Sequence, residues 1–245
     1  MSLFRKTTAP TATVPAPVGQ GPAISLDKIP SGLVDLTKKA AVSLEKSGLT
    51  GQRAAVYLVL DHSGSMIDFY RDGSVQKLAE QALGLSANLD DDGLVPLIYF
   101  GSRVDQAPDV RLASYQGIIN RTHQTVGWGS TNYAAAIDYI VDLHGDSPIP
   151  GLVIFQSDGE PDSRPHAEQA LRDASRRPLH FAFVGFGTQV GFLQKLDDLR
   201  GRTVDNASFF HARDPHRVTD EQLYDGITHE YASWLAAASA AGVIR

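Results

Sequence analysis

Apolar and polar residues follow an alternation of strand-like and helix-like patterns along most of the chain. Continuous apolar runs at residues 54–60 and 94–100 are typical of strands buried on both faces of a sheet. Between them, residues 74–89 place apolar side chains at helical spacing, and the Asp-Asp-Asp-Gly sequence at 90–93 ends this helix. The alternation predicts an α/β fold with a mostly parallel sheet and helices on both of its faces.

The same alternation continues toward the C-terminal end of the sequence. It predicts strands at residues 104–110, 152–155, 179–184 and 207–211, and helices at 115–120, 133–143, 166–176, 190–199 and 219–238. Before the first strand, residues 33–44 have the apolar spacing of a helix packed outside the core, whereas 24–26 fits an edge strand equally well.

Composition divides the chain into three parts. Residues 1–23 contain four prolines and almost no large apolar side chains, so they cannot offset the entropy of ordering and are predicted to form a flexible arm. Residues 24–50 are expected to pack as an extension on the main domain, which takes up residues 51–240. With 42% hydrophobic residues among 245, the chain can bury one sizeable core.

Charge and cysteine content exclude several classes of partner and site. A formal net charge of −6 without a Lys/Arg-rich block leaves no electrostatic attraction for nucleic acid or anionic lipid. Because the chain has no cysteine, any metal must be held by oxygen or imidazole. No apolar run reaches the ~18 residues needed to span a bilayer, and no secretory signal is evident. We therefore expect a cytoplasmic protein without direct membrane insertion.

The loop after the first predicted strand carries the residues with the clearest chemistry. Asp61, Ser63 and Ser65 occupy alternate positions, so their side chains can point the same way, and Gly64 permits a tight turn between the serines. A carboxylate and two hydroxyls form part of an oxygen cage for a hard divalent ion. In doubly wound folds, sites lie at this carboxyl end of the strands. For these three residues alone, a polar turn that caps the next helix is the simpler alternative.

Two later loops offer further oxygens at the same edge of the predicted sheet. Thr131 follows a glycine-containing loop and leads into a helix, and Asp158 directly follows a predicted strand. Mg²⁺ takes oxygen ligands in octahedral geometry, accepts one or two carboxylates and keeps water or an outside ligand. Together the five residues predict a site for Mg²⁺, with Mn²⁺ or Ca²⁺ as the other candidate ions.

The three loops together resemble a known metal site. Asp61-x-Ser63-x-Ser65, with Thr131 in Gly-Ser-Thr-Asn and Asp158 in Ser-Asp-Gly, is similar to the metal-ion-dependent adhesion site of von Willebrand factor A (vWA) domains. The resemblance implies that the serines and Thr131 contact the ion, that the aspartates act directly or through water, and that a carboxylate of a protein partner completes the coordination. It also implies the vWA fold, an open six-stranded sheet with one antiparallel edge strand, and binding rather than catalysis.

The flanking sequence is similar to one branch of that family. Residues 66–76, 90–93, 201–206 and 223–234 resemble the vWA proteins of bacterial tellurium-resistance and stress-response systems. The resemblance covers about residues 24–240. It implies a role in tellurite resistance or stress response, with other proteins of these systems as candidate partners.

A metal-dependent phosphohydrolase that uses Asp61 as its nucleophile is the main alternative function. An aspartate after a strand is where such nucleophiles stand in doubly wound folds. Enzymes of the haloacid-dehalogenase type need a second Asp two positions later as acid and base, and this chain has Ser63 there. The sequence therefore favours a protein-binding module over an enzyme. A scaffold with an empty site is the third alternative.

Four residues near the predicted ligands have no assigned chemistry. His62 lies inside the metal loop, where a protonated imidazole would oppose cation binding, but a side chain turned to solvent is the simpler expectation. Trp128 fits a recognition aromatic on the rim and a ring packed against the domain equally well. Glu160 and Asp162 lack the spacing of a calcium loop and are expected to be solvated acidic residues.

Overall fold

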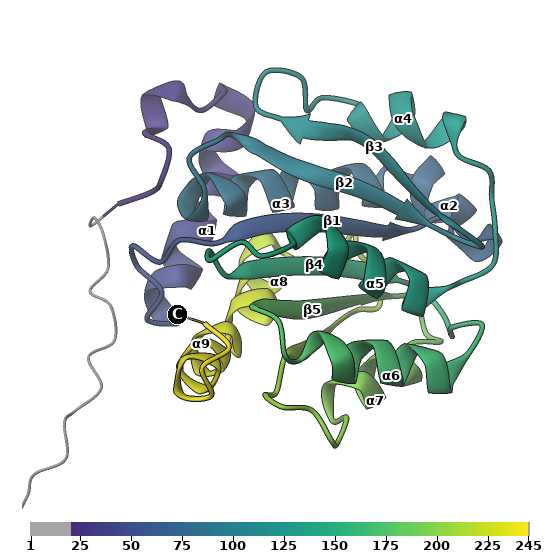
Figure 1. Cartoon of the computed structure of the whole chain (residues 1–245). Helices are drawn as coiled ribbons and strands as arrows, with labels where there is room; N and C mark the ends of the chain where they lie inside the picture. Colours follow the sequence, from purple (N-terminus) through teal and green to yellow (C-terminus); the bar gives the residue numbers. More distant parts are fainter. Residues whose placement is uncertain (1–20, 245) are drawn as a thin grey trace, which may run out of the picture.

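The computed structural model describes residues 21–244 of the chain, so the arm predicted for residues 1–23 lies almost wholly outside the described residues. In the described part, six strands form one sheet in the order β3-β2-β1-β4-β5-β6 (Figure 1). They are β1 (Ala55–Asp61), β2 (Leu94–Phe100), β3 (Val104–Arg111), β4 (Gly151–Ser157), β5 (Leu179–Phe186) and β6 (Ala207–Ala212). Strand β3 runs antiparallel to β2 and the other neighbours are parallel, which confirms the predicted fold class.

Helices cover both faces of this sheet (Figure 1). One face carries α5 (Tyr133–His144), α6 (Arg164–Ala174) and α7 (Gly191–Asp197). The other face carries α1 (Ser31–Lys46), α3 (Ser74–Leu89), α8 (Asp220–Thr228) and α9 (Tyr231–Ala240). The connections contain α2 (Ile67–Arg71), α4 (Ile118–Thr122) and short 3-10 turns at Leu26–Lys28, Gly64–Met66 and His123–Thr125.

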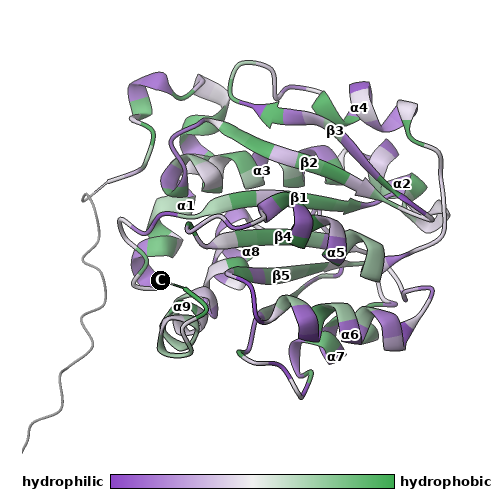
Figure 2. Cartoon of the chain, viewed as in Figure 1, coloured by the Kyte–Doolittle hydropathy of each residue, from purple (hydrophilic) through white to green (hydrophobic). Residues whose placement is uncertain are grey.

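The strands are apolar because their side chains fill two cores, one on each face of the sheet. In β1, Leu58 and Leu60 belong to the core beneath α1 and α3, whereas Val59 belongs to the core beneath α5. Successive strand residues point to opposite faces, so a central strand needs apolar side chains at nearly every position. Figure 2 shows the resulting apolar strands between the two helix layers.

Helix α1 is built into the first of these cores. Leu33 and Leu44 are buried in it. Gly84 of α3 lets the two helices approach closely, because a Cβ at this position would lie 2.9 Å from the Leu36 Cβ. Ion pairs and hydrogen bonds also tie α1 to α8. The segment before β1 therefore contributes side chains to the same core as the sheet.

The edge strand considered for residues 24–26 is not formed. The Ile24 N–H donates to the Ala87 carbonyl at 2.9 Å, and a 3-10 turn follows at Leu26–Lys28. The segment closes over the end of α3 rather than pairing with a strand. The apolar triplet at residues 24–26 does not distinguish an edge strand from a segment that packs over a helix end, because Ile24 is buried in both cases.

The single helix predicted at residues 219–238 is interrupted at His229 and Glu230 between α8 and α9. Beyond the interruption, the rings of Tyr231 and Trp234 lie 5.6 and 5.4 Å from the ring of His180 on β5, measured between centroids. The prediction of one continuous helix was therefore wrong. The helix is interrupted where Tyr231 and Trp234 pack against β5, a strand about fifty residues earlier in the chain. The spacing of apolar residues within the helix does not reveal such a distant contact.

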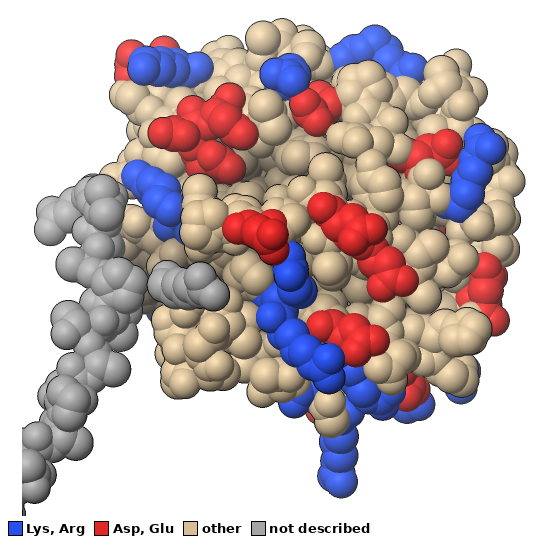
Figure 3. Space-filling view, viewed as in Figure 1, with Lys and Arg blue, Asp and Glu red and all other residues tan. Residues whose placement is uncertain are grey.

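Charged side chains of both signs are interspersed on the face of the molecule shown in Figure 3. Exposed ion pairs such as that of Arg71 with Asp68 at 2.7 Å contribute little to stability. None of the helices within residues 21–244 combines the length and apolar character required to cross a bilayer.

Replacement of Leu33 by alanine tests how strongly α1 stabilises the fold. Leu33 is fully buried, so L33A should lower the free energy of unfolding by ~2–5 kcal/mol through lost contacts and a residual cavity. Val42, on the outer side of the same helix, is 49% exposed, and V42A should change that free energy by less than ~0.5 kcal/mol. Urea denaturation of the three proteins provides the comparison. Equally small changes in both variants would mean that α1 contributes nothing to stability.

A second prediction concerns His180 and the pH dependence of stability. Its ring is buried on β5 with Nε2 3.1 Å from Ser208 Oγ, and burial lowers the pKa of His180 to about 3. The unfolded chain protonates this histidine below pH ~6.5, whereas the folded chain does not. The free energy of unfolding should therefore fall as pH falls from ~6.5 toward 3, by up to ~1.4 kcal/mol per pH unit.

Denaturation of wild type and H180Q at several pH values isolates this contribution, because the other titrating groups cancel in the comparison. Between pH ~6.5 and ~4.5, the free energy of unfolding should fall less steeply with falling pH in H180Q than in wild type. The difference in slope should correspond to the uptake of about one proton on unfolding. H166Q, which replaces an exposed histidine on α6, serves as the surface control for the loss of one histidine. Identical slopes in wild type and H180Q would refute the prediction.

Candidate metal centre

The candidate site lies where the order of strands in the sheet reverses direction. Strand β1 pairs with β2 on one side and with β4 on the other, so the loops after β1 and β4 open from the crevice between these two strands. The parallel register of Leu60 with Gln156 brings the two loops level at one edge of the sheet, at the right in Figure 1. These loops carry Asp61, Ser63, Ser65 and Asp158.

Four of the five predicted ligands are joined by hydrogen bonds. Ser65 Oγ donates to Asp158 Oδ1 at 2.8 Å, and Ser63 Oγ lies 3.2 Å from Ser65 Oγ. The Ser63 N–H donates to Asp61 Oδ1 at 2.8 Å, which turns the loop back onto the carboxylate. The hydroxyls and carboxylates therefore converge in space, as the alternate positions of the first three residues led us to expect.

Burial gives the two carboxylates an environment that favours a cation. Asp61 is fully buried, and burial raises its pKa to about 6 despite hydrogen bonds from Ser157 and Ser63. Burial also raises the pKa of Asp158. Buried charge is unfavourable unless it is compensated, and a divalent cation compensates both carboxylates at once. The donor set, two carboxylates with several hydroxyl oxygens, fits a hard ion such as Mg²⁺.

Thr131 reaches the same edge of the sheet through the backbone of its loop. Gly129 forms an isolated parallel bridge with Ser63, and its N–H donates to the His62 carbonyl at 3.1 Å. A Cβ on Gly129 would come within 2.5 Å of Ser102 N, so only glycine permits this close approach. The loop that carries Thr131 is thus held directly beside Ser63.

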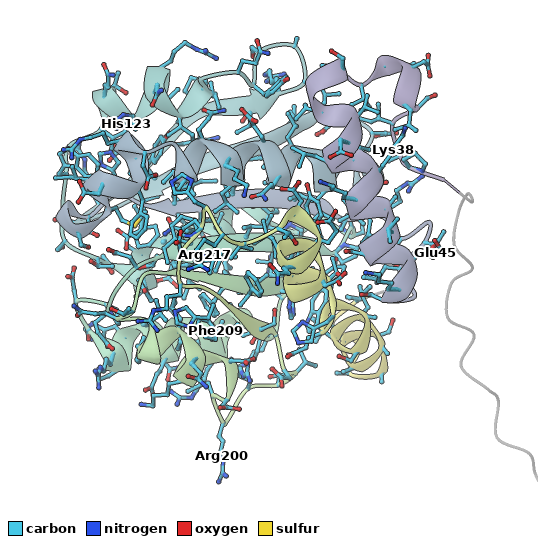
Figure 4. The ribbon with its side chains drawn as sticks, turned by 180° about the vertical axis from the view of Figure 1, so that it is seen from behind. Lys38, Glu45, His123, Arg200, Phe209 and Arg217 are labelled. Carbon is cyan, nitrogen blue, oxygen red and sulfur yellow. The ribbon has the colours of Figure 1, made fainter. Side chains whose placement is uncertain are left out.

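His62 does not turn to solvent, contrary to the simpler expectation, but is fully buried. Its ring stacks on Trp128 with 3.8 Å between centroids and 4° between planes, and its Nε2 lies 3.5 Å from His123 Nδ1. Burial lowers the pKa of His62, so its neutral form, which does not oppose a cation, is favoured. Trp128 packs on His62, as one of the two expectations had it, and still remains 42% exposed. Figure 4 shows His123 at the end of the molecule opposite to Lys38 and Glu45 of α1.

Two groups that support Asp61 were not identified from the sequence. Ser157 Oγ donates to Asp61 Oδ2 at 2.5 Å, and the Tyr70 hydroxyl donates to the Asp61 carbonyl at 2.9 Å. Ser157 ends an apolar strand directly before Asp158, a position that could have marked it as a neighbour of the site. Tyr70 has no comparable local signal, because its contact depends on how the short helix α2 folds back beneath the loop.

The arrangement provides oxygen ligands but little acid–base machinery. Within residues 21–244, no three His, Asp or Glu side chains are grouped so that they could hold a metal ion, as zinc sites require. Two residues after Asp61, where the alternative phosphohydrolase would need its acid, the Ser63 hydroxyl contacts Ser65 instead. With two carboxylates and three hydroxyls, this set would leave room in an octahedral coordination shell for water or an outside oxygen ligand.

Comparison with known proteins shows which family the chain resembles over most of its length. The family model described as "vWA found in TerF C terminus" matches residues 53–244. The chain is also 30% identical over 221 residues to the uncharacterized protein YcbR of Bacillus subtilis (strain 168), a match that covers 86% of this chain and 90% of that protein.

Solved structures share the fold at lower sequence identity. The conserved hypothetical protein BatB of Bacteroides thetaiotaomicron aligns with a TM-score of 0.53 at 15% identity, over 75% of this chain and 99% of that one. The manganese-loaded TRAP protein of Plasmodium vivax aligns with a TM-score of 0.50 at 18% identity, over 71% of this chain and 74% of that one. The chain therefore belongs to the vWA-TerF-like family, as its resemblance to vWA proteins of the tellurium-resistance type predicted.

Proposed function

We propose that this chain is a protein-binding module that depends on a divalent metal ion. The ion, Mg²⁺ in the first place with Mn²⁺ and Ca²⁺ as alternatives, is bound by Asp61, Ser63, Ser65, Thr131 and Asp158. An Asp or Glu carboxylate of a protein partner completes the coordination. The observation that carries the proposal is the hydrogen-bonded cluster of Asp61, Ser63, Ser65 and Asp158 at the crevice between β1 and β4.

The chemistry of the cluster supports binding over catalysis. Serine and threonine hydroxyls are neutral ligands, so an ion held largely by them keeps much of its attraction for an anionic group. Trp128 stands one residue from the bridge between Gly129 and Ser63, with its ring fixed by His62 and its side chain still 42% exposed. A fixed, exposed aromatic ring is a common anchor in protein interfaces, so Trp128 offers the same partner an apolar contact.

The family supports a divalent ion and a cellular setting. The TRAP protein of Plasmodium vivax is manganese-loaded on a similar fold, which is consistent with a divalent ion here. The resemblance to tellurium-resistance and stress-response proteins supports a role in tellurite resistance or stress response in the cytoplasm. We propose other proteins of those systems as the partners, and no enzymatic activity for the chain itself.

Calorimetric titration tests the metal site. Mg²⁺ and Mn²⁺ should bind the chelator-treated wild type with about one ion per chain, and D61N should weaken binding by at least ~10-fold, because it removes a buried charge that the ion compensates. Asp68 lies three residues after Ser65, but its side chain is 84% exposed and pairs with Arg71. D68N is therefore the matched control and should bind like wild type.

Two outcomes would contradict the proposal, one from that titration and one from a phosphatase assay. Binding that is lost equally in D61N and D68N would show general surface attraction rather than a site at Asp61. Metal-dependent hydrolysis of phosphate esters by the wild type, lost in D61N, would favour the phosphohydrolase. Both assays use the same protein samples.

Metal binding should also stabilise the fold by mass action, because the ligands come from loops that are distant in the unfolded chain. At Mg²⁺ concentrations ~100 times the dissociation constant, the free energy of unfolding of the wild type should rise by about 2.7 kcal/mol. With binding at least ~10-fold weaker, D61N should gain no more than ~1.4 kcal/mol at the same concentrations. Thermal denaturation with and without chelator measures the effect, and an equal increase in both proteins would place the stabilising ion elsewhere.

A further inference from the structure

Asp162, expected to be a solvated acidic residue, makes specific contacts with the loop that carries Thr131. Its Oδ1 accepts a hydrogen bond from the Thr131 N–H at 3.0 Å, and its Oδ2 accepts one from Ser130 Oγ at 2.7 Å. Its own N–H donates to the Thr131 carbonyl at 2.9 Å. Asp162 therefore engages both backbone groups of Thr131 and the side chain of the preceding residue.

A second loop also contacts Ser130. We call the contacts that Asp162 and Ser102 make with the Ser130–Thr131 segment the clamp. Ser102, in the connection between β2 and β3, has its Oγ 3.0 Å from Ser130 Oγ and accepts a hydrogen bond from the Ser130 N–H, also at 3.0 Å. Gly129 allows the two backbone segments to lie this close, because it has no Cβ. The Ser130–Thr131 segment is thus held between the β2–β3 connection on one side and the loop after β4 on the other.

Both carboxylate oxygens of Asp162 are used in these contacts, so the side chain is oriented toward the loop backbone. Glu160, two residues earlier in the same loop, differs, because its carboxylate pairs with Arg164 at 2.9 Å. Asp158 in this loop contacts Ser65. The loop after β4 therefore carries the proposed ligand Asp158 and, through Asp162, is hydrogen-bonded to the proposed ligand Thr131.

We propose that Asp162 is a positioning residue that holds Thr131 in place for the ion, without contacting the ion itself. The proposal rests on the proposed metal-binding function. It extends that function by assigning a role to a residue outside the five ligands: Asp162 links the loop after β4 to the loop before α5, so that Asp158 and Thr131 keep a fixed spacing. Without this link, the Thr131 hydroxyl would move relative to Asp158, and the ion would lose a ligand.

Affinity for Mn²⁺ and amide exchange in D162N, D162A and E160Q test the proposal. D162N retains a carbonyl oxygen for the Thr131 N–H, and its amide group can donate to the Ser130 hydroxyl, so it should bind Mn²⁺ within ~3-fold of wild type. D162A removes both contacts and should weaken binding by ~10–100-fold, the effect typical of residues that orient metal ligands. E160Q removes one negative charge from the same loop and should bind within ~3-fold of wild type.

Amide hydrogen exchange on the metal-free proteins provides a readout that does not depend on the ion. The Thr131 amide should exchange faster in D162A than in wild type, and at the wild-type rate in D162N. S130A removes the hydroxyl contacts of Ser130 with Asp162 and Ser102 but leaves the Thr131 N–H bond, so it should fall between wild type and D162A in both measurements. S130A also serves as the test variant if D162A fails to fold.

Three results would overturn the proposal, and a fourth would overturn the proposed function on which it rests. Wild-type Mn²⁺ affinity in D162A would show that the clamp does not matter for the site. Equal losses in D162N and D162A would mean that Asp162 acts through its charge, and a parallel loss in E160Q would confirm that reading. If wild type binds no Mn²⁺, the proposed function fails, and unchanged exchange at Thr131 in D162A would separately show that the clamp does not hold the loop.

Discussion

The parallel pairing of β1 with β4 is the interaction on which the candidate metal centre depends. The register of Leu60 with Gln156 places Asp61 level with Ser157, whose hydroxyl donates to the Asp61 carboxylate. Because side chains alternate along a strand, a shift of one residue in this pairing would turn the carboxylate to the opposite face of the sheet and move apolar side chains of β1 from one core to the other. The same apolar packing that fixes the sheet therefore also fixes the chemistry at its edge.

The loops at this edge are held mainly by contacts with one another. Gly129 bridges to Ser63, Ser102 and Asp162 enclose Ser130, and the stack of Trp128 on His62 adds an aromatic contact. Backbone hydrogen bonds need close approach, which explains the glycine at 129. A site built in this way is preorganised, so little ordering is required when an ion or a partner binds.

Most of the fold could be predicted from the sequence, because the apolar runs and the helical spacing are local properties. The alternation of Asp61, Ser63 and Ser65 is local too, and their convergence followed from it. Thr131 and Asp158 could be proposed only together with the predicted fold, since the fold brings their loops to the same end of the strands. Burial of His62 and the contacts of Asp162 depend on Trp128, Ser130 and Thr131 from a loop far away in the sequence. Nothing in the residues adjacent to His62 or Asp162 signals these contacts.

The residues of the centre come from distant parts of the chain, so the centre is complete only when the sheet has formed. Ser157 and Asp61 are hydrogen-bonded although they are 96 residues apart in the sequence. Closing a loop of this length costs entropy before any contact is gained, and sheets with such remote parallel pairings fold slowly. Partly folded chains, in which β4 has not yet joined β1, lack the complete set of oxygens. Under the proposed function, a partner that requires the ion would thus discriminate between finished and unfinished molecules and bind only copies whose sheet has closed.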